Sequence, residues 1–200
     1  SSQQFVVHGD QGCPREGWDT GRSWIESMVK RETRVRSVHH VGDLSYANGA
    51  AHQWEAWFYM IEPATAIWPL MIAVGNHEYD YTVTSDKDPS GVDHGYQPTW
   101  GNFGNDSGGE CGVPTSKRFT MPNNGNGIFW YSYESGLVHT TVLSSEHDLG
   151  RNSPQYEWLL RDLEKVDRRQ TPWLIVELHR PLYEGEMFWD QNNVGIALRH

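Results

Sequence analysis

The sequence predicts an α/β fold in which helices flank mixed β-sheets. Short apolar runs typical of buried strands alternate with segments of helical periodicity through roughly the first third of the chain, and this order favours parallel strands joined by helices. Two later strand runs meet at a tight turn, which adds an antiparallel pair. The chain has 200 residues, 37% of them hydrophobic, which is enough for one domain with a sizeable core.

The first five expected elements follow one another as strand, helix, strand, helix and strand. Apolar runs predict strands over 4–8, 36–42 and 69–75. Helical spacing of apolar residues predicts helices over 15–33 and 51–62, the second ending at the proline that follows it. Two successive strand–helix–strand units are therefore expected to form a parallel sheet.

The second half of the chain combines a long loop, a hairpin, a helix and a last strand. Residues 79–127 are rich in Gly, Asp, Asn, Ser and Pro and show little periodicity, which is typical of a functional loop or lid. The runs 128–134 and 137–145 predict a hairpin. Ser153 is expected to cap a helix, and 171–178 is expected to be a further buried strand.

Charge and composition exclude several classes of protein. Sixteen basic and 26 acidic residues give a net charge of −10, which argues against a nucleic-acid-binding protein. No apolar run approaches the roughly 18 residues of a membrane span. Cys13 and Cys111 allow one disulfide or none. The sequon at Asn105 could carry a glycan only if the chain is secreted.

Each predicted core strand is followed by a residue of a type that binds metals. These residues are Asp10, Asp43, the pair Asn76 and His77, and His179. Ligands bind outside the carboxyl ends of the strands in α/β sheets, so neighbouring parallel strands would bring these side chains together. The alternative is that Gly-Asp after a strand is only a turn signal. The occurrence of such residues after four predicted strands favours the shared site.

These residue types select hard or borderline cations rather than thiolate-binding ones. A carboxylate can bridge two metals, and Asp43 is the best candidate because it lies between Asp10 and Asn76 in the sequence. Two metals about 3.5–4 Å apart are a recurrent solution for phosphoester hydrolysis. Tyr46 follows Asp43 by one turn and is either a further ligand or a packed aromatic.

Four motifs resemble the purple acid phosphatases, which belong to the calcineurin-like metallophosphoesterases. The motifs are GDQG (9–12), GDLSYANG (42–49), VGNHEYD (74–80) and VELHRPLY (176–183). The stretches 107–114 and 142–159 are similar to the large eukaryotic members and their phosphodiesterase-like branch. The resemblance covers nearly the whole chain and implies a metallophosphoesterase-like βαβ sandwich, with residues 1–200 forming part of the catalytic domain.

The resemblance implies a dinuclear centre of Fe(III) and a divalent metal, which is iron, zinc or manganese in the family. Asp10 and Tyr46 match ligands of the ferric ion, Asp43 matches the bridging aspartate, and Asn76 and His179 match ligands of the divalent ion. Tyrosinate bound to ferric iron gives the family its purple colour.

The resemblance also implies a substrate site beside the metals. His77 matches the catalytic histidine that contacts the substrate phosphate, and Asn76 and Glu78 match residues at the same pocket. The expected function is an acid phosphatase in which a metal-bound hydroxide attacks small phosphorylated substrates. A secreted or vacuolar/lysosomal location is implied, no membrane span is expected, and a homodimer is left open.

Three departures from the family pattern leave alternatives open. The family's last motif, Gly-His-x-His, is absent and is expected beyond His200, so five of seven ligands are present and the chain is expected to be truncated. Leu178 stands where the family usually has glycine, and 183–193 has no histidine to assist the leaving group. The alternatives are a phosphodiesterase or nucleotide pyrophosphatase on the same centre, or a non-catalytic relative.

Overall fold

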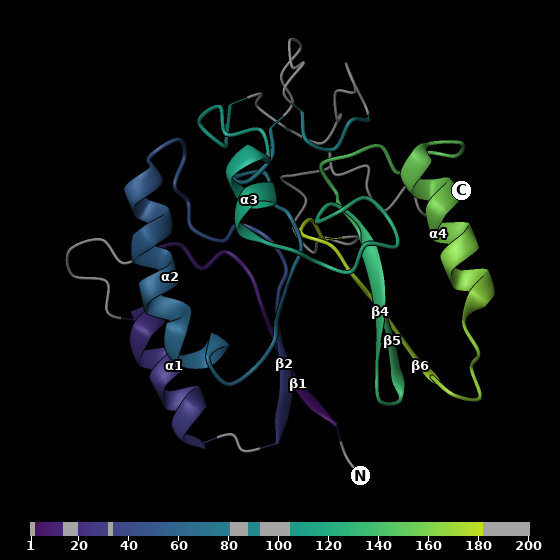
Figure 1. The fold of residues 1–200 in the computed structure, drawn as a ribbon, viewed down its shortest axis with the longest axis horizontal. Coiled ribbons are helices and arrows are strands. Elements are labelled where there is room, and N and C mark those ends of the chain that lie inside the picture. Colours follow the sequence, from purple (N-terminus) through teal and green to yellow (C-terminus); the bar gives the residue numbers. More distant parts are fainter. Residues whose placement is uncertain (1–2, 14–19, 32–33, 81–87, 93–104, 182–200) are drawn as a thin grey trace, which may run out of the picture.

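The computed structural model describes residues 3–13, 20–31, 34–80, 88–92 and 105–181. These residues form two three-stranded sheets between helices (Figure 1). The helices α1 and α2 lie beside the first sheet, and α4 lies on the far side of the second sheet. The α/β class with mixed sheets flanked by helices is therefore confirmed.

The first sheet is entirely parallel and has the order β1-β2-β3. Its strands are β1 (Gln4–His8), β2 (Val35–His40) and β3 (Leu70–Ile72). The crossover helices are α1 (Thr20–Arg31) and α2 (Ala51–Thr65). This is the predicted pair of strand–helix–strand units, although β3 is shorter than expected and α2 continues through Pro63 to Thr65.

The second sheet is mixed and has the order β4-β5-β6. The strands β4 (Tyr131–Ser135) and β5 (Val138–Val142) form the predicted hairpin, whose turn begins at Gly136 with φ of 58°. The strand β6 (Trp173–Glu177) runs parallel to β5. The strand predicted over 171–178, which precedes His179, therefore lies in a different sheet from the three strands predicted over 4–8, 36–42 and 69–75.

The remaining helices are α3 (Val113–Arg118) and α4 (Pro154–Lys165). Ser153 caps α4 as expected, because its hydroxyl accepts a hydrogen bond from the backbone N–H of Tyr156 at 3.1 Å. The short α3 lies within 79–127, for which no helix was predicted. It follows Gly112, which has φ of 76°, and Pro114 occupies its first turn.

Most of the buried apolar side chains belong to one cluster that is rich in aromatic residues. Trp54 and Trp57 of α2 are fully buried and meet edge to face at 6.0 Å.

Contacts between the sheets are partly polar. His39 of β2 pairs with Glu177 of β6 at 2.6 Å, and the Tyr131 hydroxyl of β4 donates to the Ile72 carbonyl of β3 at 2.7 Å. These bonds fix one sheet against the other. No described helix is long and apolar enough to cross a membrane.

Candidate metal centre

The candidate site lies where strands of both sheets end. Asp10 follows β1, Asp43 follows β2, and Asn76 follows β3, all in the first sheet. His179 follows β6 of the second sheet. The four strand ends that the sequence singled out do converge, but across two sheets rather than along one.

The loops after β1 and β2 run side by side and keep their backbones paired beyond the strands. The N–H groups of residues 10, 11 and 12 donate to the carbonyls of residues 42, 43 and 44 at 2.9–3.1 Å. Asp10, Asp43 and Tyr46 have φ between 50° and 54°, a region that non-glycine residues seldom adopt. Such backbone is retained at sites where the fold fixes side-chain direction, and here it accompanies candidate ligands.

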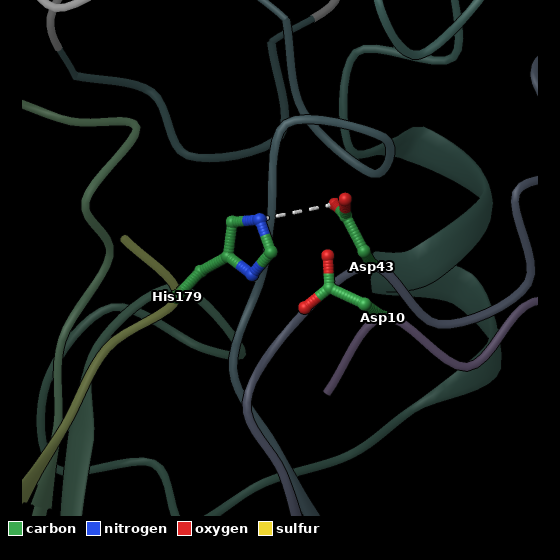
Figure 2. A group of neighbouring side chains, drawn as sticks. All are labelled: Asp10, Asp43 and His179. Atoms are coloured by element: carbon green, nitrogen blue, oxygen red, sulfur yellow. Dashed lines mark ion pairs between the residues drawn. The ribbon is translucent and has the colours of Figure 1, made fainter. Parts of the chain in front are cut away.

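Three side chains form the centre of the site (Figure 2). One ligand atom each from Asp10, Asp43 and His179 lies within 4.8 Å of the others. Nε2 of His179 is 3.4 Å from an oxygen of Asp43. The imidazole Nδ1–H donates to the carbonyl of Val41 at 3.0 Å, so the Nε2 atom faces the carboxylates. This is the arrangement in which histidine binds a metal while its second nitrogen is held.

The other two expected ligands lie at the edge of this group. The Tyr46 hydroxyl donates to Asp10 at 3.1 Å. The Asn76 side-chain oxygen is 3.1 Å from Nε2 of His179. The structure thus gathers all five expected ligands, and their oxygen and nitrogen donors fit hard or borderline cations.

Two glycines make room for this packing. An ideal Cβ on Gly75 would overlap the Asp43 carboxylate and lie 2.9 Å from Cδ2 of His179. At Gly42, where φ is 101°, a Cβ would lie 2.7 Å from Nδ1 of His179. The close approach of the candidate ligands therefore requires glycine at both positions.

Proton affinities at the site reflect burial and close opposite charges. Burial would by itself raise the pKa of the Asp43 carboxyl, but the hydrogen bond and positive charge of His179 hold it below the ordinary value. Burial would likewise lower the pKa of His179, yet Asp43 raises it to about 9. Burial and two nearby carboxylates raise the pKa of Tyr46 above its ordinary value.

His77 lies against the same group. Its backbone N–H donates to Asp43 at 3.0 Å, and its Nδ1 is 2.8 Å from the Asn48 side-chain oxygen. Its ring packs on Tyr46 with 4.2 Å between ring centres. Nε2 of His77 is 4.0 Å from the second oxygen of Asp43. The free edge of the imidazole therefore faces the cluster that a substrate would approach.

Glu78 does not lie where a substrate can reach it, which corrects the expectation that it binds substrate. The side chain is 0% exposed. One oxygen accepts from the backbone N–H groups of Asp43 and Gly75 at 2.7 and 3.0 Å, and the other accepts from Leu44 at 2.7 Å. Burial raises the pKa of this carboxyl to about 8, helped by the charge of Asp43. Glu78 instead ties together the loops that follow β2 and β3.

Two supporting contacts were not found from the sequence. Arg180, next to His179, binds both oxygens of buried Glu146 at 2.7 and 3.2 Å, which anchors the end of β6 to the loop after β5. Asp106 accepts a hydrogen bond from the Asn76 amide at 3.0 Å. The sequence showed the motifs that contain Arg180 and Asn76, but it did not show that Glu146 and Asp106 would contact them.

The structure shows the surroundings of Leu178, which departs from the family pattern, and of the two cysteines. Leu178 is partly buried and packs against the main hydrophobic cluster, so contact with the core accommodates its bulk. The two cysteines form no disulfide in this structure: the Cys13 thiol hydrogen-bonds Gln53, and the Cys111 thiol lies 3.3 Å from Asp80. The segment 183–193 lies outside the described residues.

Comparisons with known proteins agree with this fold. The chain matches the family described as calcineurin-like phosphoesterase over residues 7–199. It is 35% identical to "Probable inactive purple acid phosphatase 27" of Arabidopsis thaliana, over 94% of this chain and 30% of that protein. It is 33% identical to "Nucleotide pyrophosphatase/phosphodiesterase" of Hordeum vulgare, over 94% of this chain and 50% of that protein.

A solved structure is also similar. A purple acid phosphatase isolated from yellow lupin (Lupinus luteus) seeds superposes with a TM-score of 0.78 at 34% identity, over 94% of this chain and 32% of that one. The chain belongs to the calcineurin-like phosphoesterase family. Within that family it is a purple acid phosphatase-like metallophosphoesterase. It spans only 30% of the Arabidopsis relative.

Proposed function

We propose that the chain carries most of a dinuclear centre that hydrolyses phosphate esters, as part of a catalytic domain that includes residues 1–200. The observation that carries this proposal is the convergence of two carboxylates and an imidazole within 4.8 Å at the ends of strands from both sheets. The family acts on phosphate esters, and the net charge of −10 makes a local positive centre necessary for binding them.

The donors could be divided between two cations, with Asp43 shared by both. Asp10 and Tyr46 would hold a ferric ion, Asn76 and His179 would hold a divalent ion (iron, zinc or manganese), and Asp43 would bridge them. Two such cations, when bound, polarise phosphoryl oxygens and lower the pKa of a water molecule. The glycine cradle that accommodates Asp43 and His179 supports this assignment.

The chain's own residues would orient the phosphoryl group. Nδ1–H of His77 donates to the side-chain oxygen of Asn48, so Nε2 would donate to a phosphoryl oxygen when the imidazole is doubly protonated. His77 would thus act as the catalytic residue that contacts substrate, with the Asn76 amide beside it. Burial of Asp43 at the base of the cluster keeps its carboxylate in one position, which favours a fixed substrate geometry.

A second candidate reaction is hydrolysis of phosphodiesters or nucleotide pyrophosphates at the same centre. The Hordeum vulgare relative with this name supports it, and so does the absence of histidine from 183–193 in the sequence. A non-catalytic role is the third candidate, because the Arabidopsis relative is named inactive.

The test compares the full-length protein with its Asp43→Asn and Asp167→Asn variants on an aryl phosphate, a diester and a nucleotide pyrophosphate. Asp167 lies before β6, at the end opposite His179, so Asp167→Asn is a matched control. We expect hydrolysis by wild type and the control, and its loss in Asp43→Asn. The preferred substrate separates the first two candidates. If the metal-loaded wild-type protein hydrolyses none of the three substrates, the non-catalytic role is the candidate that remains.

A secreted or vacuolar/lysosomal location is part of the same proposal. Asn105 of the sequon is exposed, as an attached glycan requires. The measurement is the electrophoretic mobility of the natural protein before and after glycosidase treatment, and an unchanged mobility would remove this support.

A further inference from the structure

Asp106 lies immediately behind Asn76, on the side away from the centre of the site. Its carboxylate accepts a hydrogen bond from the Asn76 side-chain nitrogen at 3.0 Å. The other end of the same amide, the oxygen of Asn76, is 3.1 Å from Nε2 of His179. The amide of Asn76 is therefore held between a carboxylate and the candidate ligand cluster.

The chemistry of these groups fixes which end of the amide faces the cluster. The nitrogen and oxygen ends of an asparagine side chain have nearly the same shape, but only the oxygen can bind a cation. A carboxylate accepts hydrogen bonds and donates none when ionised. Asp106 therefore pairs with the nitrogen end and turns the oxygen end of Asn76 toward His179.

We propose that Asp106 is a positioning residue, which sets the Asn76 amide with its oxygen toward the metal centre. This inference rests on the proposed function, because it assigns Asp106 a role at the same site. It extends that function to the segment 105–112, which lies in the long loop predicted over 79–127.

The segment that carries Asp106 is anchored independently of Asn76. The backbone N–H of Ser107 donates to Asp80 at 2.9 Å, and the N–H of Gly112 donates to the Glu78 carbonyl at 2.8 Å. Glu110 accepts from the indole N–H of Trp54 at 3.1 Å. Because these bonds hold the segment at both ends, Asp106 is in place before a metal binds, and its orientation need not be selected on binding.

The same segment also touches the support of His77. Gly108, with φ of 62°, packs so closely against the Asn48 carbonyl that a Cβ there would overlap it. Asn48 in turn contacts Nδ1 of His77 at 2.8 Å. One anchored segment thus lies beside both consecutive polar residues, Asn76 and His77. Among the described hydrogen bonds, Asp106 is the residue of this segment whose side chain contacts Asn76.

The first experiment measures zinc(II) affinity of the metal-depleted full-length protein by calorimetric titration. We expect Asp106→Ala to weaken zinc binding by about 10- to 100-fold, as is typical when a group that orients a metal ligand is removed. Asp106→Asn should stay within a few-fold of wild type, because its side-chain oxygen can still accept from Asn76. Both variants keep the Asn105 sequon, so glycosylation is matched.

Asp167→Ala is the control for loss of a negative charge far from the site, and it should leave zinc affinity unchanged. Equal losses in Asp106→Ala and Asp106→Asn would mean that the charge of Asp106, not its hydrogen bond, attracts the cation, and would overturn the positioning role. Wild-type affinity in Asp106→Ala would overturn it as well. Thermal unfolding of each variant reports whether it is folded.

A double-mutant cycle supplies a readout that a merely structural role would not give. In an Asn76→Ala background, Asp106→Ala should cause no further loss of zinc affinity, because its target is gone. An undiminished loss there would contradict the proposal. A folded wild-type protein that binds no metal would overturn the proposed function itself. Zinc affinity that is unchanged by Asp106→Ala would remove only this inference.

Discussion

Gly75→Ala tests whether the close packing of the candidate ligands is what the site requires. Gly75 has no left-handed φ, so alanine fits its backbone. The added Cβ would overlap the Asp43 carboxylate, lie 2.6 Å from the Asp43 amide nitrogen and lie 2.9 Å from Cδ2 of His179. Something must shift, and the nearest groups are the central candidate ligands.

The size of the effect follows from what can move. The Asp43 backbone is held by Glu78 at 2.7 Å, so the side chains of Asp43 and His179 must rotate or the loop must shift. Inserting a methyl group into a well-packed site costs about 1–3 kcal/mol, which is about 2–12 °C in melting temperature for a domain of this length. Displacing two ligands should weaken metal affinity by about 100-fold or more, at or beyond the upper end of the effect of losing an orienting group.

The assay pairs thermal unfolding of the metal-free protein with metal titration of the full-length protein. Gly150→Ala is the matched control, because Gly150 also has an ordinary φ and its Cβ would meet the carboxylate of the Asp148 side chain, whose nearest oxygen lies at 3.0 Å. We expect the control to bind metal as wild type does. Wild-type metal affinity in Gly75→Ala would refute the reasoning that ligand packing at this glycine defines the centre.

Two further predictions concern stability. Burial lowers the pKa of His147 to about 4, below its unfolded value of about 6.5. Its stabilising contribution is complete above pH 6.5 and is lost as the pH falls toward 4, amounting to about 2 kcal/mol by pH 5. Urea unfolding should show that the free energy of unfolding falls less between pH 7 and pH 5 in His147→Gln than in wild type, by that amount. An equal fall in both proteins would contradict the assignment. Tyr131→Phe removes the hydroxyl that donates to the Ile72 carbonyl and accepts from its N–H, at 2.7 and 3.1 Å. Both backbone groups then lose their partner, so we expect a loss of about 1–3 kcal/mol in urea unfolding at pH 7, and stability equal to wild type would show that the bond between sheets is dispensable.

The structure explains why a long polar segment is retained beside the candidate centre. Residues 105–112 connect to Trp54 of α2, to the loop after β3 and to Asn76. Their hydrogen bonds replace the regular backbone pairing that a strand or helix would provide. The segment therefore acts as a rigid support, although its composition is that of a loop.

The local elements could be predicted from the sequence because short-range spacing determines them. Apolar periodicity predicted α2, Ser153 predicted the start of α4, and two adjacent strand runs predicted the hairpin of β4 and β5. The placement of Asp10 and Asp43 after β1 and β2 was also visible, because strand ends and turn residues are adjacent along the chain. These features depend on neighbours a few residues away.

Only the tertiary structure decided which sheet delivers each group and which side chains remain accessible. His179 reaches the centre from the second sheet, and buried Glu78 accepts hydrogen bonds from three backbone N–H groups of the loops after β2 and β3. Asp106 meets Asn76 across 30 positions of sequence. Sheet pairing and burial arise from contacts between distant segments. Residue type and spacing therefore identified the donors, while long-range packing determined which of them face one another and which are enclosed.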